Sequence, residues 1–455
     1  MVLQPEEAGQ ARSVSADEAG RGRQIRLAAV ASVIGTSIEW YDFFLYGTAA
    51  AIVFPSVFFP ASSSYAGTLE SFATYAVGFA ARPVGAAVFG HWGDRIGRKA
   101  TLIITLLMMG LASALVGVLP GTDSIGIAAP ILLVVLRLLQ GLAVGGEWSG
   151  SVLLSMEWGN QRRRGLMASW PQIGVPIGLL LGTGAMTAIA LSAESAFKAW
   201  AWRIPFLASL LLVAIGLWVR LKVLETPMFA QLVEKKSVVK IPTLEVLRRY
   251  PRQVLLSALL RMSEQAPFYI YSAFALTYIT GHLHKSKGLG LAAVTVGGAL
   301  ELILIPVFGN LSDTAGRRRV YATGAVLIGV TAFPAFLLLN TGAAGLVVLG
   351  VALIAIPHAI QYGPQSSYIA ENFPTGLAYA GSGLGYQTAS LIAGGPAPLL
   401  ATWMLPNFGW QAISVYIIAC SVLTLIAVAL LPDRSRSELG EAPLLTPAAG
   451  RPAPG

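Results

Sequence analysis

The stretch GHWGDRIGRK at residues 90–99 decides the fold, because GNLSDTAGRRR at residues 309–319 repeats its pattern with the same internal spacing. Each copy places a glycine, an aspartate, a second glycine and two basic residues in a short charged turn between two long apolar stretches. A duplication of this kind is typical of transporters built from two membrane bundles of like topology. The repeat therefore predicts two helical bundles that face each other.

Composition places most of the chain in a lipid bilayer. Hydrophobic residues make up 55% of the sequence and charged residues only 12%, whereas soluble domains carry roughly 25% charged residues. Apolar runs of about 20 residues can span a membrane as helices. The runs predict an all-α membrane protein with twelve transmembrane helices in two pseudo-symmetric six-helix bundles, near residues 27–56, 69–93, 100–119, 127–156, 165–192, 202–222, 253–280, 289–312, 319–340, 344–371, 377–402 and 409–431.

Basic residues indicate which ends of the spans face the cytoplasm. They gather in alternate loops, and loops rich in Lys and Arg are cytoplasmic. We therefore expect a multi-pass protein of the plasma (inner) membrane with both termini in the cytoplasm. The net charge of +9 is then a topology signal, and nucleic acid is not implied as a partner. The expected units are a cytoplasmic tail at 1–26, a bundle at 27–222, a cytoplasmic loop at 223–252, a second bundle at 253–431 and a disordered cytoplasmic tail at 432–455.

A few charged residues lie deep within the expected spans. At about 1.5 Å of rise per residue, Asp42, Arg82, Arg137 and Glu301 sit roughly 15 to 22 Å from the membrane surface. A charge at this depth costs about 2.5 to 3.5 kcal/mol on insertion scales, so such residues are functional candidates. Residues three apart share a helical face, which pairs Glu39 with Asp42 and Arg261 with Glu264.

Asp42 is the candidate proton carrier. Burial favours the neutral form of a carboxyl group, whereas a neighbouring Arg137 or Arg82 favours the charged form. If an anionic substrate draws the arginine away, Asp42 takes up a proton, and the two fluxes are coupled. The expected proton-coupling set is Asp42, with Arg137 as its counter-charge, and Glu39. A static buried ion pair that only fixes helix packing is the alternative.

Polar and charged side chains on the same helices are candidates for substrate binding. Arg82 or Arg261 is the expected anchor. Tyrosine and glutamine side chains within a bundle also form structural hydrogen bonds between helices, so that alternative stays open for them. The candidates are Arg82, Tyr41, Gln140, Gln172, Arg261, Glu264, Tyr269, Glu301, Gln361, Tyr362 and Gln387. A histidine can titrate near neutral pH, but His358, beside Pro357, is expected to be a packing residue. No metal-ligand cluster or phosphate loop is present, so we expect no cofactor, with the proton gradient as energy source.

Each charged turn is also a candidate gate. Gly97 permits a tight reversal, and Asp94 lies close to Arg95 and Arg98, whose partners can change as the cytoplasmic rim opens. Static surface charge pairs are the alternative, because exposed salt bridges are individually weak. The candidates from the two turns are Gly90, Asp94, Arg95, Gly97, Arg98, Asp313 and Arg317.

GHWGDRIGRK resembles the signature of the major facilitator superfamily, and its second copy extends the likeness over nearly the whole chain. The resemblance implies the major facilitator fold. A second duplicated element resembles the superfamily's glutamate followed seven residues later by arginine: Glu157 with Arg164 in MEWGNQRRRG, and Glu371 in AENFPTGLAYAG. It implies gating roles for these three residues. The second copy departs from the pattern, because Ala378 stands where the family usually has arginine, and Asn160 replaces a common proline in the first copy.

A finer resemblance is to the metabolite:proton symporter family, whose members import carboxylates such as 2-oxoglutarate, citrate or shikimate, or zwitterions such as proline and betaine, with a proton. Tyr41, Asp42 and Arg137 also resemble the proton-coupling residues of the related sugar porters. The blocks that carry the likeness are EWYDFFLYG at 39–47, ARPVGAAVFGHWGDRIGRK at 81–99, RLLQGLAVGGEW at 137–148, PQIGVPIG at 171–178, WRIPF at 202–206 and ETPMF at 225–229.

The expected function is import of a small organic carboxylate with protons by alternating access, carried out by a monomer with no enzymatic activity. Intramembrane arginines favour a carboxylate, because a guanidinium binds it bidentately. Two alternatives remain open. One is a zwitterionic osmolyte such as proline or betaine, whose ammonium group suits the aromatic faces of Tyr41, Phe43 and Tyr46. The other is a drug or metabolite exporter of the same fold that works as a proton antiporter.

Overall fold

A computed structural model describes residues 5–62, 64–192, 196–235 and 239–437. Within these residues the chain is helical, with short connections and no strands. The first four residues of the expected N-terminal tail, and the expected C-terminal tail beyond residue 437, lie outside the described residues.

The first bundle contains six long helices at the expected spans, joined by short helical turns. Pro83 in α3 and Pro171 and Pro176 in α7 lie inside helices, which membrane bundles tolerate because neighbouring groups satisfy the freed backbone. The elements are α1 (Pro5–Ile52), α2 (Phe54–Phe58), α3 (Ser64–Ile96), α4 (Arg98–Val118), α5 (Thr122–Ile125), α6 (Ala128–Trp158), η1 (Gln161–Arg163), α7 (Arg164–Ser192), η2 (Phe197–Ala201) and α9 (Arg203–Lys222).

The connection between the bundles is more ordered than its polar sequence indicates. It holds α10 (Pro227–Glu234) and α11 (Pro242–Arg249). Each begins with a proline, whose fixed φ suits the first helical position and whose missing N–H costs nothing there. Thr226 caps α10 by accepting a hydrogen bond from the Phe229 N–H.

The second bundle contains an interrupted span that the apolar runs do not reveal. The span expected at 253–280 is a series of short segments, with a break at Arg261 and π-helical turns that begin at Ile270 and Tyr278. Gly409, with φ of 75°, breaks the last helix at the boundary expected between the spans at 377–402 and 409–431. The elements are α12 (Pro251–Leu260), α13 (Met262–Tyr269), η3 (Ile270–Phe274), α14 (Ala275–Thr277), η4 (Tyr278–His282), α15 (Lys287–Ala315), α16 (Arg317–Asn340), α17 (Ala344–Ala370), η5 (Thr375–Leu377), α18 (Ala378–Ala389), η6 (Ser390–Gly394) and α19 (Pro396–Leu430).

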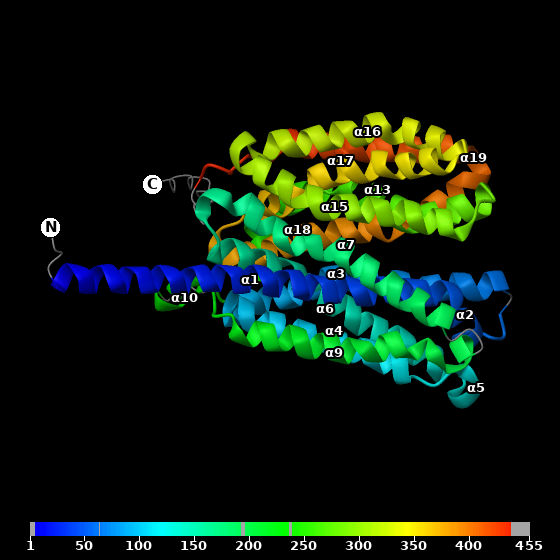
Figure 1. The fold of residues 1–455 in the computed structure, drawn as a ribbon, viewed down its shortest axis with the longest axis horizontal. Helices are drawn as coiled ribbons and strands as arrows, with labels where there is room; N and C mark the ends of the chain where they lie inside the picture. Colours follow the sequence, from blue (N-terminus) through cyan, green and yellow to red (C-terminus); the bar gives the residue numbers. More distant parts are fainter. Residues whose placement is uncertain (1–4, 63, 193–195, 236–238, 438–455) are drawn as a thin grey trace, which may run out of the picture.

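The two bundles lie side by side along the long axis of the molecule (Figure 1). At their interface α7 packs against α15 and α17, and α18 packs against α3 and α6. Helix α10 lies at the end of the molecule where the described chain also begins and finishes, and α5 lies at the opposite end. We call these the α10 end and the α5 end.

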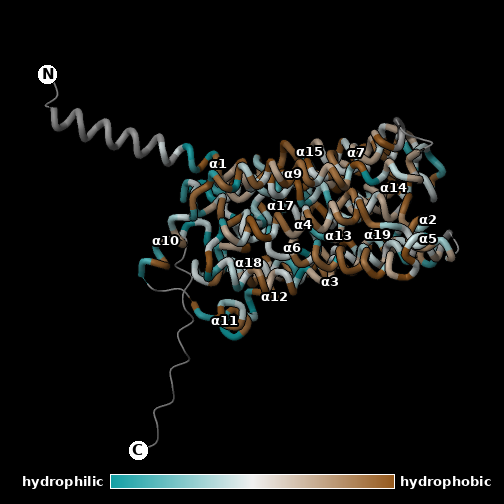
Figure 2. Tube along the Cα trace, turned by 90° about the horizontal axis from the view of Figure 1, so that it is seen from below, coloured by the Kyte–Doolittle hydropathy of each residue, from teal (hydrophilic) through white to brown (hydrophobic). Residues whose placement is uncertain are grey.

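Hydropathy follows the expected pattern of a membrane protein. Hydrophobic residues cover the length of the bundles, and hydrophilic residues gather around α10 and α11 (Figure 2). Within the described residues, eight helices are long and apolar enough to cross a membrane by length and composition alone. Helices α1 and α3 are not among these eight, and neither is the span that starts at α12, which is broken into short pieces. They carry Glu39, Asp42, Arg82 and Arg261, four of the candidate site residues.

Candidate functional site

Arg82 of α3 is a buried arginine without an acidic partner. Its side chain is nearly inaccessible, at 3% exposure. Its guanidinium carbon lies 4.5 Å from the ring centre of Phe79, 4.7 Å from that of Phe43 and 5.9 Å from that of Trp40. Among the residues that the structure describes, no carboxylate forms an ion pair with it. A buried cation that lies over aromatic faces and forms no ion pair within the described residues is able to bind an anion.

Arg137 of α6 is held in a similar way. Its guanidinium carbon lies 4.3 Å from the ring centre of Tyr46 and 4.8 Å from that of Tyr75. It donates a hydrogen bond to Gln140 Oε1 at 3.1 Å, and its Nε has no hydrogen-bond partner within the described chain. In this conformation Arg137 therefore forms no ion pair with Asp42, in contrast to the expected direct pairing.

Asp42 is fully buried inside the first bundle. Ser209 of α9 donates a hydrogen bond to its Oδ1 at 2.5 Å, whereas its Oδ2 has no partner in the described part of the chain. Glu39, one helical turn before it, is also buried and has an unpartnered Oε2. Both candidate proton carriers thus keep one oxygen free to hold a proton.

The second bundle contributes a denser group of charges. Arg261, at the break between α12 and α13, donates a hydrogen bond from Nε to Glu264 Oε2 at 3.1 Å and from Nη1 to the Tyr386 carbonyl at 2.5 Å. His358 lies 3.4 Å from Glu264 Oε1 and 2.6 Å from Glu301 Oε1. Arg261 therefore forms an ion pair with a carboxylate, whereas Arg82 forms none among the described residues.

A small cavity lies where the two bundles meet. Its volume is about 10 Å³, which is roughly room for one water molecule. Aromatic contacts close the interface around it, with the ring centres of Trp40 and Phe268 5.8 Å apart and those of Phe79 and Tyr269 5.5 Å apart. The bundles have thus closed on the site in this conformation. The lining residues are Trp40, Val175, Arg261, Glu264, Gln265, Phe268, His358, Tyr362 and Tyr386.

The expected amide side chains connect helices and do not point into free space. Gln172 accepts a hydrogen bond from Trp148 Nε1 at 3.0 Å and donates to the Tyr362 carbonyl at 3.5 Å. Gln387 donates to the Val144 carbonyl at 3.3 Å, across the bundle interface. These two glutamines fit the structural alternative considered for them.

Three further candidates form hydrogen bonds with partners in their own bundle. Gln140 donates to Ser113 at 2.7 Å, and Gln361 accepts from Ser263 at 2.5 Å. The Tyr41 hydroxyl donates to the Pro205 carbonyl at 2.7 Å, which turns it toward α9. Of the tyrosines expected to bind substrate, only Tyr269 and Tyr362 lie where the bundles meet.

The first charged turn joins the bundles at the α10 end. The Asp94 carboxylate accepts hydrogen bonds from the backbone N–H groups of Tyr379 at 3.3 Å and Ala380 at 3.0 Å, in the first turn of α18. The unpaired N–H groups of a helix N-terminus stabilise a carboxylate. Arg98 pairs with Asp94 and with Glu157, each at 3.2 Å.

The second charged turn forms the equivalent contacts in the opposite direction, from the second bundle to the first. The Asp313 carboxylate accepts hydrogen bonds from the N–H groups of Gly165 at 2.7 Å and Leu166 at 3.0 Å, in the first turn of α7. Arg317 pairs with Asp313 at 2.7 Å and with Glu371 at 3.0 Å. Each bundle thus caps a helix of the other, and the α10 end is closed.

The two copies differ where Ala378 replaces the family's arginine. Arg164 of the first copy reaches across the interface to the carboxylate of the second copy, with its Nε 3.1 Å from Glu371 Oε1. The matching carboxylate of the first copy, Glu157, has no such arginine and accepts a hydrogen bond from the Thr226 hydroxyl. The connection between the bundles therefore supplies a neutral donor in place of the missing charge.

Acidic side chains outside the spans cap the helices that follow the two turns. Glu225 accepts from the N–H groups of Arg98 and Lys99, both at 3.2 Å. Asp433 plays this part in the second copy and accepts from the Arg318 N–H at 3.0 Å. Burial would raise the pKa of Asp433, but hydrogen bonds from Arg318 and Ser435 hold it below its usual range. The C-terminal segment is thereby tied to the gate.

Two glycines in the turns are required by close approach. A Cβ on Gly90 would lie 2.6 Å from the Ala380 Cα, and one on Gly309 would lie 2.7 Å from the Ser169 Cβ. The turns themselves are formed by Gly97, with φ of 106°, and by its counterpart in the second copy. Arg95, expected in the gate, is exposed and contacts His91 at 3.2 Å, outside the network.

Sequence reasoning missed two participants. His358, expected to be a packing residue, contacts two carboxylates, and that expectation is wrong. Arg220, near the end of the span expected at 202–222, is buried and pairs with Glu147. The sequence did offer a reason to consider His358. Glu264 and Glu301 were both expected in the second bundle, and Arg261 was the only cation paired with them.

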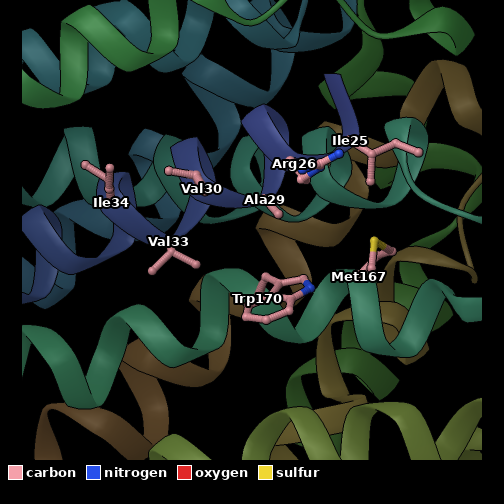
Figure 3. Close-up of a pocket in the computed structure, with 8 residues that line it drawn as sticks. All are labelled: Ile25, Arg26, Ala29, Val30, Val33, Ile34, Met167 and Trp170. Carbon is pink, nitrogen blue, oxygen red and sulfur yellow. The ribbon is translucent and has the colours of Figure 1, made fainter. Parts of the chain in front are cut away.

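A larger cavity lies between α1 and α7 near the α10 end, with a volume of about 500 Å³ (Figure 3). Its only charged lining residue is Arg26, which is exposed. The other lining residues are Ile25, Ala29, Val30, Val33, Ile34, Met167 and Trp170. This apolar recess contains none of the candidate site residues.

A family model described as Major Facilitator Superfamily matches residues 32–396 and, in a second match, residues 254–448. The chain is similar to the shikimate transporter of Escherichia coli (strain K12), with 41% identity covering 90% of this chain and 95% of that protein. It is 40% identical to the inner membrane metabolite transport protein YhjE of the same strain, over 90% of this chain and 94% of that one.

Two further similarities are more distant. The proline/betaine transporter of Escherichia coli (strain K12) is 32% identical, over 94% of this chain and 86% of that protein. Among solved structures, the proton:xylose symporter XylE bound to 6-bromo-6-deoxy-D-glucose has a TM-score of 0.74 at 16% identity, over 93% of this chain and 99% of that one. This last similarity confirms the expected fold.

Proposed function

This chain belongs to the major facilitator superfamily, and we propose that it imports a small organic carboxylate together with protons. Like its relatives, it is a multi-pass membrane transporter and not an enzyme. We assign the α10 end to the cytoplasm, because basic residues gather in its loops. Both termini are then cytoplasmic, and the membrane is the inner membrane.

The observation that carries the proposal is that Arg82 is buried and forms no ion pair within the described residues. The buried guanidinium lies over the rings of Phe79, Phe43 and Trp40 and forms no ion pair with a carboxylate of the described residues. A substrate carboxylate would supply two oxygens in the geometry that a guanidinium binds best. Arg137, also without an ion pair within the described residues, adds to the positive potential.

A zwitterion such as proline or betaine fits this site less well. Its ammonium group would need open aromatic faces, and the faces of Phe43, Phe79, Tyr46 and Tyr75 are already covered by the two arginines. The similarity to a proline/betaine transporter therefore counts for less than the closer similarity to a shikimate transporter.

Transport follows from rocking of the bundles. The cavity between the bundles is too small for a substrate, so the site must open for one to enter. The Asp94 and Asp313 caps close the cytoplasmic side in this conformation, and opening that side requires both to release the helices of the opposite bundle. Asp42, with one oxygen free, is the proposed carrier of the coupled proton.

Binding of radiolabelled compounds to the detergent-solubilised protein tests the substrate class. The panel is shikimate, 2-oxoglutarate, citrate, proline, betaine and an amphiphilic drug. We expect a carboxylate to bind and Arg82→Gln to abolish its binding, while Arg319→Gln, a change at an exposed arginine, leaves it intact. Binding of betaine that does not depend on Arg82 would favour the osmolyte alternative, and binding of the drug alone would favour the exporter.

A further inference from the structure

The second bundle holds a buried cluster of titratable side chains that the proposed function leaves unused. It consists of Arg261, Glu264, Glu301, Tyr271 and His358. Each is at most 3% exposed. Arg261, Glu264 and His358 line the cavity where the bundles meet.

Both carboxylates in the cluster accept hydrogen bonds from neighbouring side chains. Glu264 Oε2 accepts from Arg261 Nε at 3.1 Å and from Gln365 Nε2 at 2.8 Å. Glu301 Oε1 accepts from the Tyr271 hydroxyl at 2.5 Å and lies 2.6 Å from His358 Nδ1. Glu301 Oε2 has no partner in the described chain.

The two ring nitrogens of His358 therefore face two acceptors. Nδ1 faces Glu301 at 2.6 Å and Nε2 faces Glu264 at 3.4 Å. A neutral imidazole has one donor and one acceptor, and only the protonated ring can donate from both nitrogens. Imidazole is also ordinarily a stronger base than a carboxylate. The hydrogen bonds thus place an additional proton on His358.

Charge balance independently requires one additional proton in the cluster. Glu264 and Glu301 carry two negative charges when ionised, and Arg261 supplies one positive charge. An uncompensated charge is costly in a membrane interior, and a protonated His358 makes the cluster neutral. The other groups facing His358 add no charge in their ordinary forms: Tyr362 on its own helix, Phe268 of α13, Tyr271 of η3 and, behind Gln365, Tyr321 of α16.

We propose that Glu301, His358 and Glu264 form a second proton-carrying site, which loads and releases one proton per transport cycle separately from Asp42. This inference rests on the proposed function for its consequence. Without its proton the cluster has one net negative charge facing the cavity and repels an anionic substrate. The proton and the carboxylate therefore bind together, and the proton leaves to water when the cytoplasmic side opens.

The proton can be observed directly, without any substrate. The chain has four histidines, so nitrogen NMR of protein labelled at histidine is simple to assign, and His358→Gln identifies the signal. We expect both ring nitrogens of His358 to be protonated at neutral pH in the wild-type protein. In Glu301→Gln the cluster is balanced without the extra proton, and we expect a neutral ring. The control Glu234→Gln, at an exposed glutamate, should leave the signal unchanged.

Substrate binding supplies a second and independent measurement, with radiolabelled shikimate as the probe. His358→Gln leaves the net negative charge in place, so we expect binding to weaken by roughly tenfold or more, in the range of coupling between sites. Adding Glu301→Gln to that variant restores the balance and should recover most of the affinity. A merely structural histidine predicts the opposite order, with the double variant the weaker binder.

The outcomes separate this inference from the proposed function. If no carboxylate binds the wild-type protein, the proposed function fails while the NMR measurement still decides the protonation of His358. A neutral His358 ring in the wild type, or a ring that stays protonated in Glu301→Gln, would overturn the second site. So would a double variant that binds shikimate no better than His358→Gln.

Discussion

Asp42 and Arg137 lie in neighbouring helices of the first bundle, yet each is held by a neutral partner. Ser209 holds the carboxylate and Gln140 the guanidinium. A carboxylate bound by one hydroxyl and a guanidinium resting on tyrosine rings are both free to exchange partners. This arrangement suits a proton carrier better than the static ion pair that was its alternative, because a static pair would be formed in the resting protein.

Asp42→Asn removes the proposed proton carrier at little steric cost. We expect the variant to lose uphill accumulation of substrate, because no proton then moves with it, while exchange of substrate across the membrane at equal concentrations is retained. Asp123→Asn, at an exposed aspartate in α5, is the control and should behave as the wild type. Proton-driven accumulation retained in Asp42→Asn would remove Asp42 from this role.

Thr226→Val tests the replacement of the missing arginine at position 378. The variant leaves Glu157 with Arg98 but without the hydroxyl donor. A buried acceptor that loses its partner costs roughly 1–3 kcal/mol, so we expect a lower midpoint of thermal unfolding in detergent. Thr187→Val, at an exposed position of α7, should change the midpoint far less. Equal midpoints would show that Thr226 does not support the gate.

At the scale of the elements, the gate is made by helix termini. Asp94 of α3 caps α18, and Asp313 of α15 caps α7. Such caps form only when the bundles touch, since the acceptor and the donors belong to different bundles. The closed state is therefore stabilised by contacts that all break together when the cytoplasmic side opens.

Gly90→Ala should prevent this closure, because the added Cβ would lie 2.6 Å from the Ala380 Cα. We expect the bundles to stay apart at the cytoplasmic side. Spin labels on Arg162→Cys and Arg319→Cys, both exposed, report the separation by pulsed electron resonance, since the native Cys420 is buried. The matched control is Gly184→Ala, where a Cβ meets nothing within 4 Å. A label distance in Gly90→Ala equal to that in the control would contradict this account of the gate.

Over the whole molecule, the architecture and the charge pairs between residues close in sequence could be predicted, and the pairings between distant helices could not. Apolar run lengths and the repeated turn locate the spans, because both are local properties of the sequence. The break at Arg261 interrupts a helix without interrupting hydrophobicity, so no run length reveals it, whereas Gly409 lies at the boundary expected between the last two spans. The partners of His358 and Arg220 depend on which faces of distant helices meet. Depth in the membrane selected charged candidates that are buried in the structure, but it does not say which of them touch.

The central claim is that a carboxylate enters with protons. The most direct test is uptake of radiolabelled shikimate and 2-oxoglutarate into proteoliposomes, with and without an inward proton gradient, in the wild-type protein and in Arg82→Gln. The account predicts accumulation of one of these acids above its external concentration only when the gradient is present, and none in the variant. Accumulation that does not depend on the gradient, or export of a preloaded amphiphile as protons enter, would contradict it.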